Sequence, residues 1–358
     1  MSELEQMRQE TTTIPVRLLA LALSVSAVTQ PWVPHADAAG RQNKTKLGTL
    51  DVDLIRPQWY VQDKEIERSA RRLFTEQKFS DLEALGEACR HRIPAYPNGL
   101  TQLGAFRKAL TKPADYDQQF KLLDAWLKAK PNSSLASAVY ADNLVDWAWD
   151  ARGTGYSQTV SDRAHNLMQE RLSRARKMLE QVKDRSKRVP IWYSAMQTVA
   201  LGQGWEKDEY MRLFQEAIES YPEYCPFYFN AVYYLQPRWY GDEHEWEQFA
   251  AREADRLGGS SGDVLYARIV WNVHRDMGDD NLRKSSFDYQ RAKKGLLAIS
   301  GQYPQDLSAR SELAWLATMR NDIETARKIF LDLDSKVAIN VWEDKKKFFE
   351  LRKIALEE

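Results

Sequence analysis

The 358-residue sequence predicts an all-α fold, a tetratricopeptide-like α-α superhelix in which helix pairs stack as a helical-repeat solenoid. Three observations lead to this prediction. Apolar residues recur at helical spacing through most of the chain, and prolines end several of these stripes. No segment shows sustained alternation of apolar and polar residues flanked by hairpin turn residues.

Composition and charge narrow the class of protein further. The chain has 12 Trp, 16 Tyr and 12 Phe but only 16 Gly and 13 Pro, which suits a chain with a sizeable packed core. Its 51 basic residues balance 51 acidic ones, so no basic surface for a nucleic-acid partner is expected.

The first 38 residues have the pattern of a signal peptide. An apolar run at 18–28 (LLALALSVSAV) follows Arg17 and precedes Ala36-Asp37-Ala38, which suits cleavage after Ala38. The run is shorter than the roughly 20 apolar residues of a transmembrane helix, so we expect no stable membrane span after cleavage. The mature protein would be periplasmic or secreted. An uncleaved anchor or a buried helix remains the alternative, and the true start could be Met7 instead of Met1.

Beyond the signal peptide, residues 39–61 look like an extended lead-in and residues 62–134 like N-terminal helical pairs. Two helical segments, 100–110 and 117–130, lie between Pro97 and Pro131. These prolines are 34 positions apart, which is the tetratricopeptide period. The spacing therefore predicts one such repeat here.

A third helix is expected from Leu135 to about Ala151, and the stretch WAWDARGTGYSQTV (147–160) follows its last turns. Gly153 and Gly155 lack the Lys-Ser/Thr ending of a phosphate loop and the third glycine of a dinucleotide fingerprint. We interpret them as a hinge between helices, with Ser157, Thr159 or Ser161 capping the next helix.

Further helices are expected at 161–182 and 208–220, and residues 276–358 look like C-terminal tetratricopeptide-like helices. In that part, residues 306–334 resemble one repeat. The small, turn and aromatic positions that carry this resemblance are Ala314, Leu316, Asn321-Asp322, Ala326 and Phe330.

Asp142 interrupts the apolar stripe of the helix that starts at Leu135, and a carboxylate in such a place needs a partner. Asp146, Asp150 and Arg152 are the expected members of its ion network. The network either ties helices together or contacts a ligand. Together with Glu243, these carboxylates are also the candidate acid/base groups of an alternative function, a hydrolase of cell-wall glycan or peptide.

The sequence gives no reason to expect a metal or a cofactor. The histidines lie far apart, and residues 242–245 (DEHE) are interpreted as the acidic first turn of a helix. Cys89 and Cys225 are 136 positions apart, and the sequence leaves open whether they pair or remain buried thiols.

Aromatic residues concentrate between Trp192 and Trp271, where most rings are expected to fill the core. The loop Pro237–Gly241 differs, because it places an arginine beside aromatic rings outside a helix. The candidate binding residues are Trp149, Arg152, Tyr156, Tyr193, Arg238 and Trp239, expected to serve as aromatic anchors and arginine forks. Braces between helices are the alternative role for the same side chains.

Four blocks in this order, ARGTGYSQTVS, WYSAMQTVALGQGW, YPEYCPFYFNAVYYLQPRWYGDEHEWEQFA and YARIVW, resemble the bacterial DUF4034 family. The resemblance covers residues 136–271 and defines a DUF4034-like helical core at 135–275. The family is functionally uncharacterised, so the resemblance implies a bacterial helical protein and supplies no reaction and no catalytic residues.

Taken together, the sequence predicts an exported, non-enzymatic helical-repeat protein that binds a protein or peptide partner in the bacterial envelope. The carboxylate hydrolase is the alternative from a different class. A third possibility is an envelope immunity or stress factor.

Overall fold

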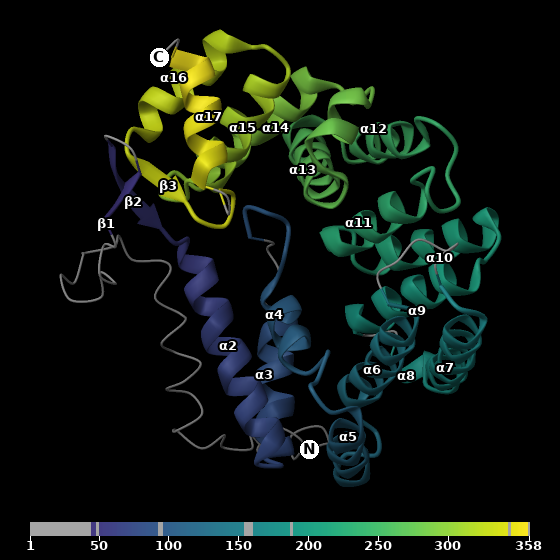
Figure 1. Ribbon diagram of the computed structural model, residues 1–358. Coiled ribbons are helices and arrows are strands. Elements are labelled where there is room, and N and C mark those ends of the chain that lie inside the picture. Colours follow the sequence, from purple (N-terminus) through teal and green to yellow (C-terminus); the bar gives the residue numbers. More distant parts are fainter. Residues whose placement is uncertain are drawn as a thin grey trace, which may run out of the picture. The chain divides into compact units, whose positions relative to one another are not determined.

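The computed structural model describes residues 44–47, 50–91, 96–153, 160–186, 189–342 and 345–356. All of them belong to one compact unit, residues 43–358 (Figure 1). The sequence-based boundaries at 134/135 and 275/276 fall inside this unit, and the second lies within α13 (Gly259–Lys284), close to a kink at Gly278, where φ is 76°.

The described chain is dominated by helices, which confirms the all-α class. In chain order they are α2 (Gln58–Thr75), α3 (Phe79–His91), α4 (Gln102–Ala109), α5 (Tyr116–Ala129), α6 (Ser134–Arg152), α7 (Asp162–Gln181), α8 (Lys183–Ser186), α9 (Pro190–Gln203), α10 (Lys207–Ser220), α11 (Cys225–Tyr234), α12 (Glu245–Leu257), α13, α14 (Tyr289–Gln302), α15 (Ser308–Met319), α16 (Ile323–Leu333) and α17 (Lys345–Leu356).

Local capping explains where several of these helices begin. The Asp115 carboxylate accepts hydrogen bonds from the amides of Asp117 and Gln118 at the start of α5. Ser133 and Ser161 cap α6 and α7 in the same way, through a side-chain oxygen that accepts from an amide in the first turn. Of the three residues expected to cap the helix after the hinge, Ser161 is therefore confirmed, while Ser157 and Thr159 lie outside the described residues.

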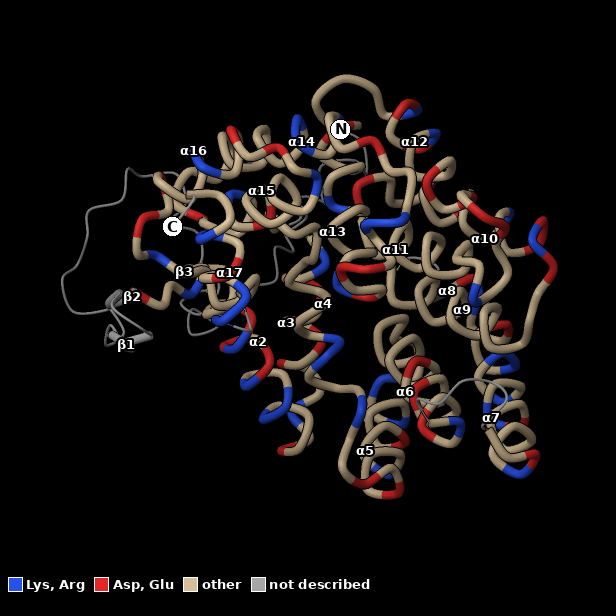
Figure 2. Tube along the Cα trace, turned by 45° about the horizontal axis from the view of Figure 1, so that its top comes forward, with Lys and Arg blue, Asp and Glu red and all other residues tan. Residues whose placement is uncertain are grey.

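Successive helices pack against their neighbours through a continuous apolar core. Trp126, Trp192 and Trp342 are among its largest fully buried side chains. Contacts join α5 to α6, α6 to α7, α12 to α13, α13 to α14, and α15 to α16, the order expected of stacked helix pairs. Acidic and basic residues are interspersed along the helices (Figure 2).

Helices α15 and α16 occupy the segment 306–334, in which the sequence predicts a repeat, and they pack against each other. α15 and α16 are joined by a tight turn in which Asn321 adopts a left-handed conformation, with φ 58°. The Asp322 side chain caps α16 by accepting from the amide of Thr325, and Ala326 and Phe330 are fully buried against α15 and its neighbours.

A small three-stranded sheet is not predicted from the sequence. β1 (Lys44–Leu47) pairs antiparallel with β2 (Leu50–Ile55), and β2 pairs parallel with β3 (Lys336–Ala338), so that Leu54 lies opposite Val337. Helix α2 also begins inside the segment 39–61 that the sequence predicts to be extended. The expectation of an extended lead-in up to residue 61 is therefore wrong at its C-terminal end.

Contacts between distant parts of the sequence accompany this sheet. The Trp59 indole N–H donates to Asp306 Oδ2 at 2.8 Å, and the Arg268 guanidinium donates to the carbonyls of Tyr96 and Pro97, each at 3.0 Å. Elements near the start of the unit thus touch elements near its end. An open solenoid, in which each repeat touches only its neighbours, has no such contacts.

Two smaller points complete the fold. Cys89 and Cys225 are both buried and no disulfide joins them. Among the described helices, none combines the length and apolar character needed to cross a membrane.

Candidate binding surface

The structure brings together two predicted tryptophans that are 90 positions apart in the sequence. Trp149, at the end of α6, and Trp239, in the loop after α11, form an edge-to-face pair with ring centroids 5.8 Å apart. The Arg152 guanidinium carbon lies 5.7 Å from the Trp149 centroid and 5.6 Å from that of Trp239. One cation therefore contacts both rings, a cation–π arrangement.

Arg238 extends this cluster along the same loop. Its guanidinium lies 4.8 Å from the ring centroid of Tyr233, which in turn is 5.6 Å from the Trp239 ring. Arg238 also forms an ion pair with Asp276 on α13, and the Gln236 amide donates to the same carboxylate at 3.0 Å. We call the five residues Trp149, Arg152, Tyr233, Arg238 and Trp239 the Arg–Trp surface.

The backbone explains why these side chains meet. Gly153 ends α6 with φ 73°, and its amide donates to the carbonyl of Trp149. The Trp149 ring packs close to Gly202 of α9, where a Cβ atom would lie 3.2 Å from it. In the second loop, a Cβ on Gly241 would lie 1.9 Å from the Leu235 carbonyl oxygen, so only glycine fits this turn.

Two polar atoms of the Arg–Trp surface have no hydrogen-bond partner among the described residues. The indole nitrogens of Trp149 and Trp239 are buried and find no hydrogen-bond acceptor among the described residues. A buried donor without an acceptor costs about 1–3 kcal/mol. Both rings are themselves only partly buried, although their indole nitrogens are not exposed.

The predicted residue Tyr193 is placed elsewhere. Its side chain is 2 % exposed, with edge-to-face contacts to Trp192 and Phe227, and it belongs to the core between α9 and α11. Tyr156 lies outside the described residues. Four of the six candidate binding residues therefore meet in one cluster.

A neighbouring arginine–tryptophan contact was not singled out from the sequence. The Arg171 guanidinium of α7 lies 3.6 Å from the ring centroid of Trp147 and donates to its carbonyl oxygen at 2.7 Å. This pair ties α7 to α6 next to the Arg–Trp surface, to which Trp149 belongs.

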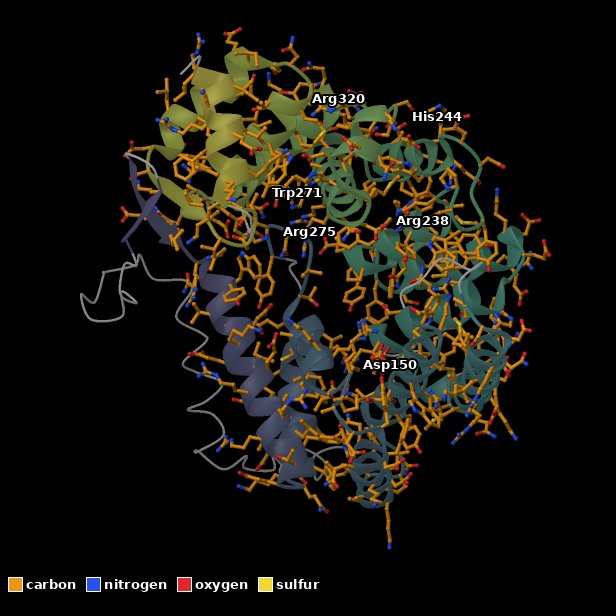
Figure 3. The ribbon with its side chains drawn as sticks, in the orientation of Figure 1. Asp150, Arg238, His244, Trp271, Arg275 and Arg320 are labelled. Carbon is orange, nitrogen blue, oxygen red and sulfur yellow. The ribbon has the colours of Figure 1, made fainter. Side chains whose placement is uncertain are left out.

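The ion network predicted around Asp142 names Arg152 as its cation, and this part of the prediction is wrong, because the cation is Arg107. The Asp142 side chain is fully buried and forms a bidentate ion pair with Arg107 of α4, at 2.6 and 2.7 Å, and not with Arg152. Burial and the nearby Asp142 carboxylate raise the pKa of Asp146 to about 7. Asp150 is exposed near the end of α6 (Figure 3).

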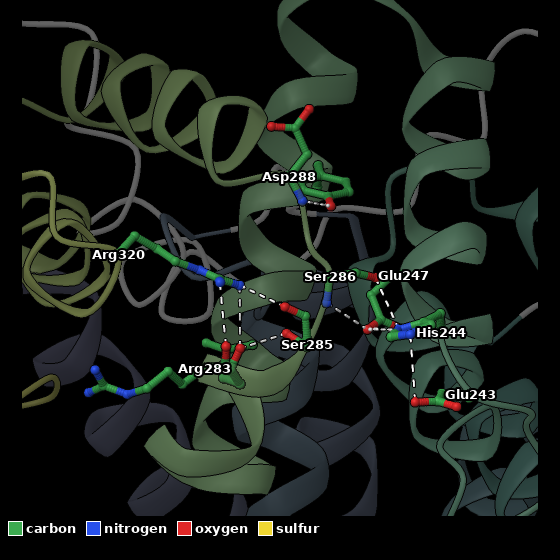
Figure 4. A network of polar contacts seen from close by, with 10 residues as sticks. Glu243, His244, Glu247, Arg283, Ser285, Ser286, Asp288 and Arg320 are labelled. Atoms are coloured by element: carbon green, nitrogen blue, oxygen red, sulfur yellow. Dashed lines mark hydrogen bonds and ion pairs between the residues drawn. The ribbon is translucent and has the colours of Figure 1, made fainter.

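The segment 242–245 is only partly the helix turn that the sequence predicts. α12 begins at Glu245, and His244 precedes it in a left-handed conformation with φ 64°. His244 contacts Glu247 and Ser286, and the Ser286 amide donates to Glu247 at 3.2 Å (Figure 4). Glu243 is exposed beside this brace.

One buried carboxyl was missed in the sequence. Glu312 of α15 is 5 % exposed, and burial, reinforced by Asp306, raises its pKa to about 8. Ser308 and Ser311 on the same helix are also buried. Polar residues at helical spacing in LSARSELAWL are therefore the sequence pattern that could have indicated a buried polar group here. Among the described residues, no group of three or more His, Cys, Asp or Glu side chains could hold a metal ion.

Comparison with known proteins adds no relative: no family model matches the sequence, and no curated protein matches it.

Proposed function

We propose that this protein is an exported α-helical repeat protein that binds a protein or peptide partner in the bacterial envelope through the Arg–Trp surface. The observation that carries the proposal is the pair of buried indole N–H groups, on Trp149 and Trp239, without acceptors among the described residues. A partner carbonyl or carboxylate that accepts from them would remove the cost of leaving these donors unpaired.

The chemistry of the surface favours a peptide or protein ligand. Tryptophan and arginine are the residue types that most often dominate binding energy at protein interfaces. Here Arg152 and Arg238 hold the aromatic rings in place through cation–π contacts. A partner would therefore meet a preorganised surface and lose little side-chain entropy on binding.

The remaining parts of the proposal rest on the sequence. Residues 1–38 carry the signal-peptide pattern that implies export, and the four blocks that resemble the DUF4034 family imply a bacterial source. The stacking of neighbouring helix pairs supports a tetratricopeptide-like superhelix. A role in envelope immunity or stress would use the same binding surface.

Two of the four carboxylates of the hydrolase alternative, Asp142 and Glu243, do not form an acid/base pair. Acid/base work needs two carboxyl groups that face one substrate. Asp142 is held by Arg107, whereas Glu243 is exposed beside the His244 brace. We therefore do not propose a hydrolase.

Affinity capture from an envelope extract, with mass spectrometry of the retained proteins, tests the proposal. The double variant Trp149→Phe/Trp239→Phe keeps an aromatic ring at each position but removes both indole N–H groups, and it should lose the proteins that the wild type retains. The matched control is Arg176→Gln, because Arg176 also stacks on a tryptophan, Trp205 at 4.5 Å, outside the Arg–Trp surface. Equal retention by the wild type and the double variant would contradict the proposal.

A further inference from the structure

Two arginines of α7 meet at one tryptophan of α6. Helices α6 and α7 lie side by side (Figure 1). The guanidinium carbons of Arg171 and Arg174 lie 3.6 and 5.4 Å from the ring centroid of Trp147. The two arginines are three positions apart on α7, so their side chains extend over the same face of that helix. Trp147 therefore brings two positive charges together in one place.

The Trp147 ring is itself held by an aromatic cluster. It makes an edge-to-face contact with Phe120 of α5, with ring centroids 5.5 Å apart, and its centroid lies 6.2 Å from that of Tyr116. Phe120 also packs against Tyr140, at 5.5 Å between centroids. Arg171 is fixed a second time, because it donates to the Trp147 carbonyl oxygen at 2.7 Å. Aromatic packing between α5 and α6 thus sets the position at which the arginines of α7 meet.

No described carboxylate forms an ion pair with either arginine. Arg174 is exposed and makes no hydrogen bond with a described residue. The negative charges of Glu170 and Asp150 act on Arg171, but neither carboxylate lies within ion-pair distance of it. Burial lowers the pKa of Arg171, and the positive charge of Arg174 lowers it further. Two like charges are therefore held close together without a direct counter-charge.

We propose that Arg171 and Arg174 form a binding site for the phosphate group of a small ligand, either free phosphate or a phosphate ester. The Arg174 guanidinium, whose donors have no described partner, pairs with two phosphate oxygens, and the free N–H groups of Arg171 donate to a third. Trp147 keeps both cations in place without neutralising them. The bound oxyanion supplies the counter-charge that the two arginines lack.

Charge and hydrogen-bond geometry favour a phosphate over a carboxylate here. A phosphate monoester carries a charge of about −1.5 to −2 at neutral pH, which matches two arginines, whereas a carboxylate carries a single charge. A guanidinium that packs on an aromatic ring keeps the N–H groups at its edge for bidentate pairing with phosphate oxygens. This site shares no residue with the Arg–Trp surface, and the proposal does not rest on the proposed function.

Titration calorimetry with phenyl phosphate, in a buffer of low ionic strength, tests the site. At about pH 8 this probe is a dianion, and it should bind the wild-type protein at least about tenfold more tightly than benzoate, which has the same ring and a single charge. Inorganic phosphate, titrated in the same way, distinguishes the two sources of the group. Affinity equal to that of phenyl phosphate indicates that free phosphate is sufficient, and weaker binding indicates an ester.

Substitutions on α7 locate the bound group. Arg174→Gln and Arg171→Gln each remove one of the two cations, and each should lower the affinity for phenyl phosphate by about tenfold or more. The matched control is Arg163→Gln, which removes an exposed arginine in the first turn of the same helix and should keep the wild-type affinity. Circular dichroism establishes that each variant is folded. Absence of phenyl phosphate binding to folded wild-type protein, equal affinity for benzoate, or equal losses in Arg163→Gln and Arg174→Gln would overturn the proposal.

Discussion

Replacing Glu312 by glutamine keeps the size of the buried side chain and its ability to donate a hydrogen bond, but removes its ability to ionise. In the folded protein the pKa of Glu312 is raised from its ordinary value of 4.5 to about 8. Between these pH values the folded chain keeps a proton that the unfolded chain has lost. The wild type therefore loses stability as the pH rises through this window, by about 1.4 kcal/mol for each pH unit.

Across the whole window the difference amounts to roughly 5 kcal/mol. Wild type and Glu312→Gln should have similar free energies of unfolding near pH 4.5, and above pH 8 the variant should be the more stable protein by that amount. Urea unfolding of both proteins at several pH values measures the difference directly, because every other titrating group is common to the pair. A difference in stability that stays constant across the window, or a variant less stable at alkaline pH, would refute the reasoning.

Three further predictions concern packing and chemistry. Arg107→Ala should lower the free energy of unfolding by about 3–5 kcal/mol because it leaves the Asp142 carboxylate buried without its partner; a loss below about 1 kcal/mol in urea unfolding would count against a buried pair. Gly241→Ala should destabilise by about 1–3 kcal/mol, because a Cβ would overlap backbone 1.9 Å away. Gly301→Ala, where a Cβ meets nothing within 4 Å, should be neutral or slightly stabilising, and equal melting temperatures for the two alanine variants would contradict this. Both cysteines should react with a thiol reagent only after unfolding, since both are buried; rapid reaction of the native protein would show that a thiol is accessible.

The helices were predictable because their signals are local. The stripe at 117–130 and its following proline correspond to α5, and the glycine after Arg152 ends α6 with the left-handed geometry that only a few residues adopt readily. The sheet escaped prediction although Leu50, Val52 and Leu54 alternate with two aspartates, because its third strand comes from residues 336–338. Pairing between such distant segments leaves no local pattern.

In the candidate site, too, the features that are local in the sequence were predictable and the contacts between distant residues were not. Trp149 and Trp239 were singled out one by one from their local settings, but their contact depends on packing between α6 and the loop after α11. The partner of Asp142 lies 35 positions earlier, on α4, whereas the sequence predicts a partner on the same helix. Tyr193 is a residue type that often anchors partners at protein surfaces, and the sequence predicts it as a binding residue. In the structure it is buried, because several neighbouring helices cover α9.

The most direct test of the central claim is to observe the two indole N–H groups of the Arg–Trp surface during binding. In a protein with ¹⁵N-labelled tryptophan, the Nε1–H signals of Trp149 and Trp239 are assigned from the Trp→Phe variants and followed as the partner retained by affinity capture is added. Binding through this surface should move both signals, with the large downfield shift of a newly formed hydrogen bond, and leave the signal of Trp205 in place. Saturating partner that leaves the Trp149 and Trp239 signals unchanged would contradict the account.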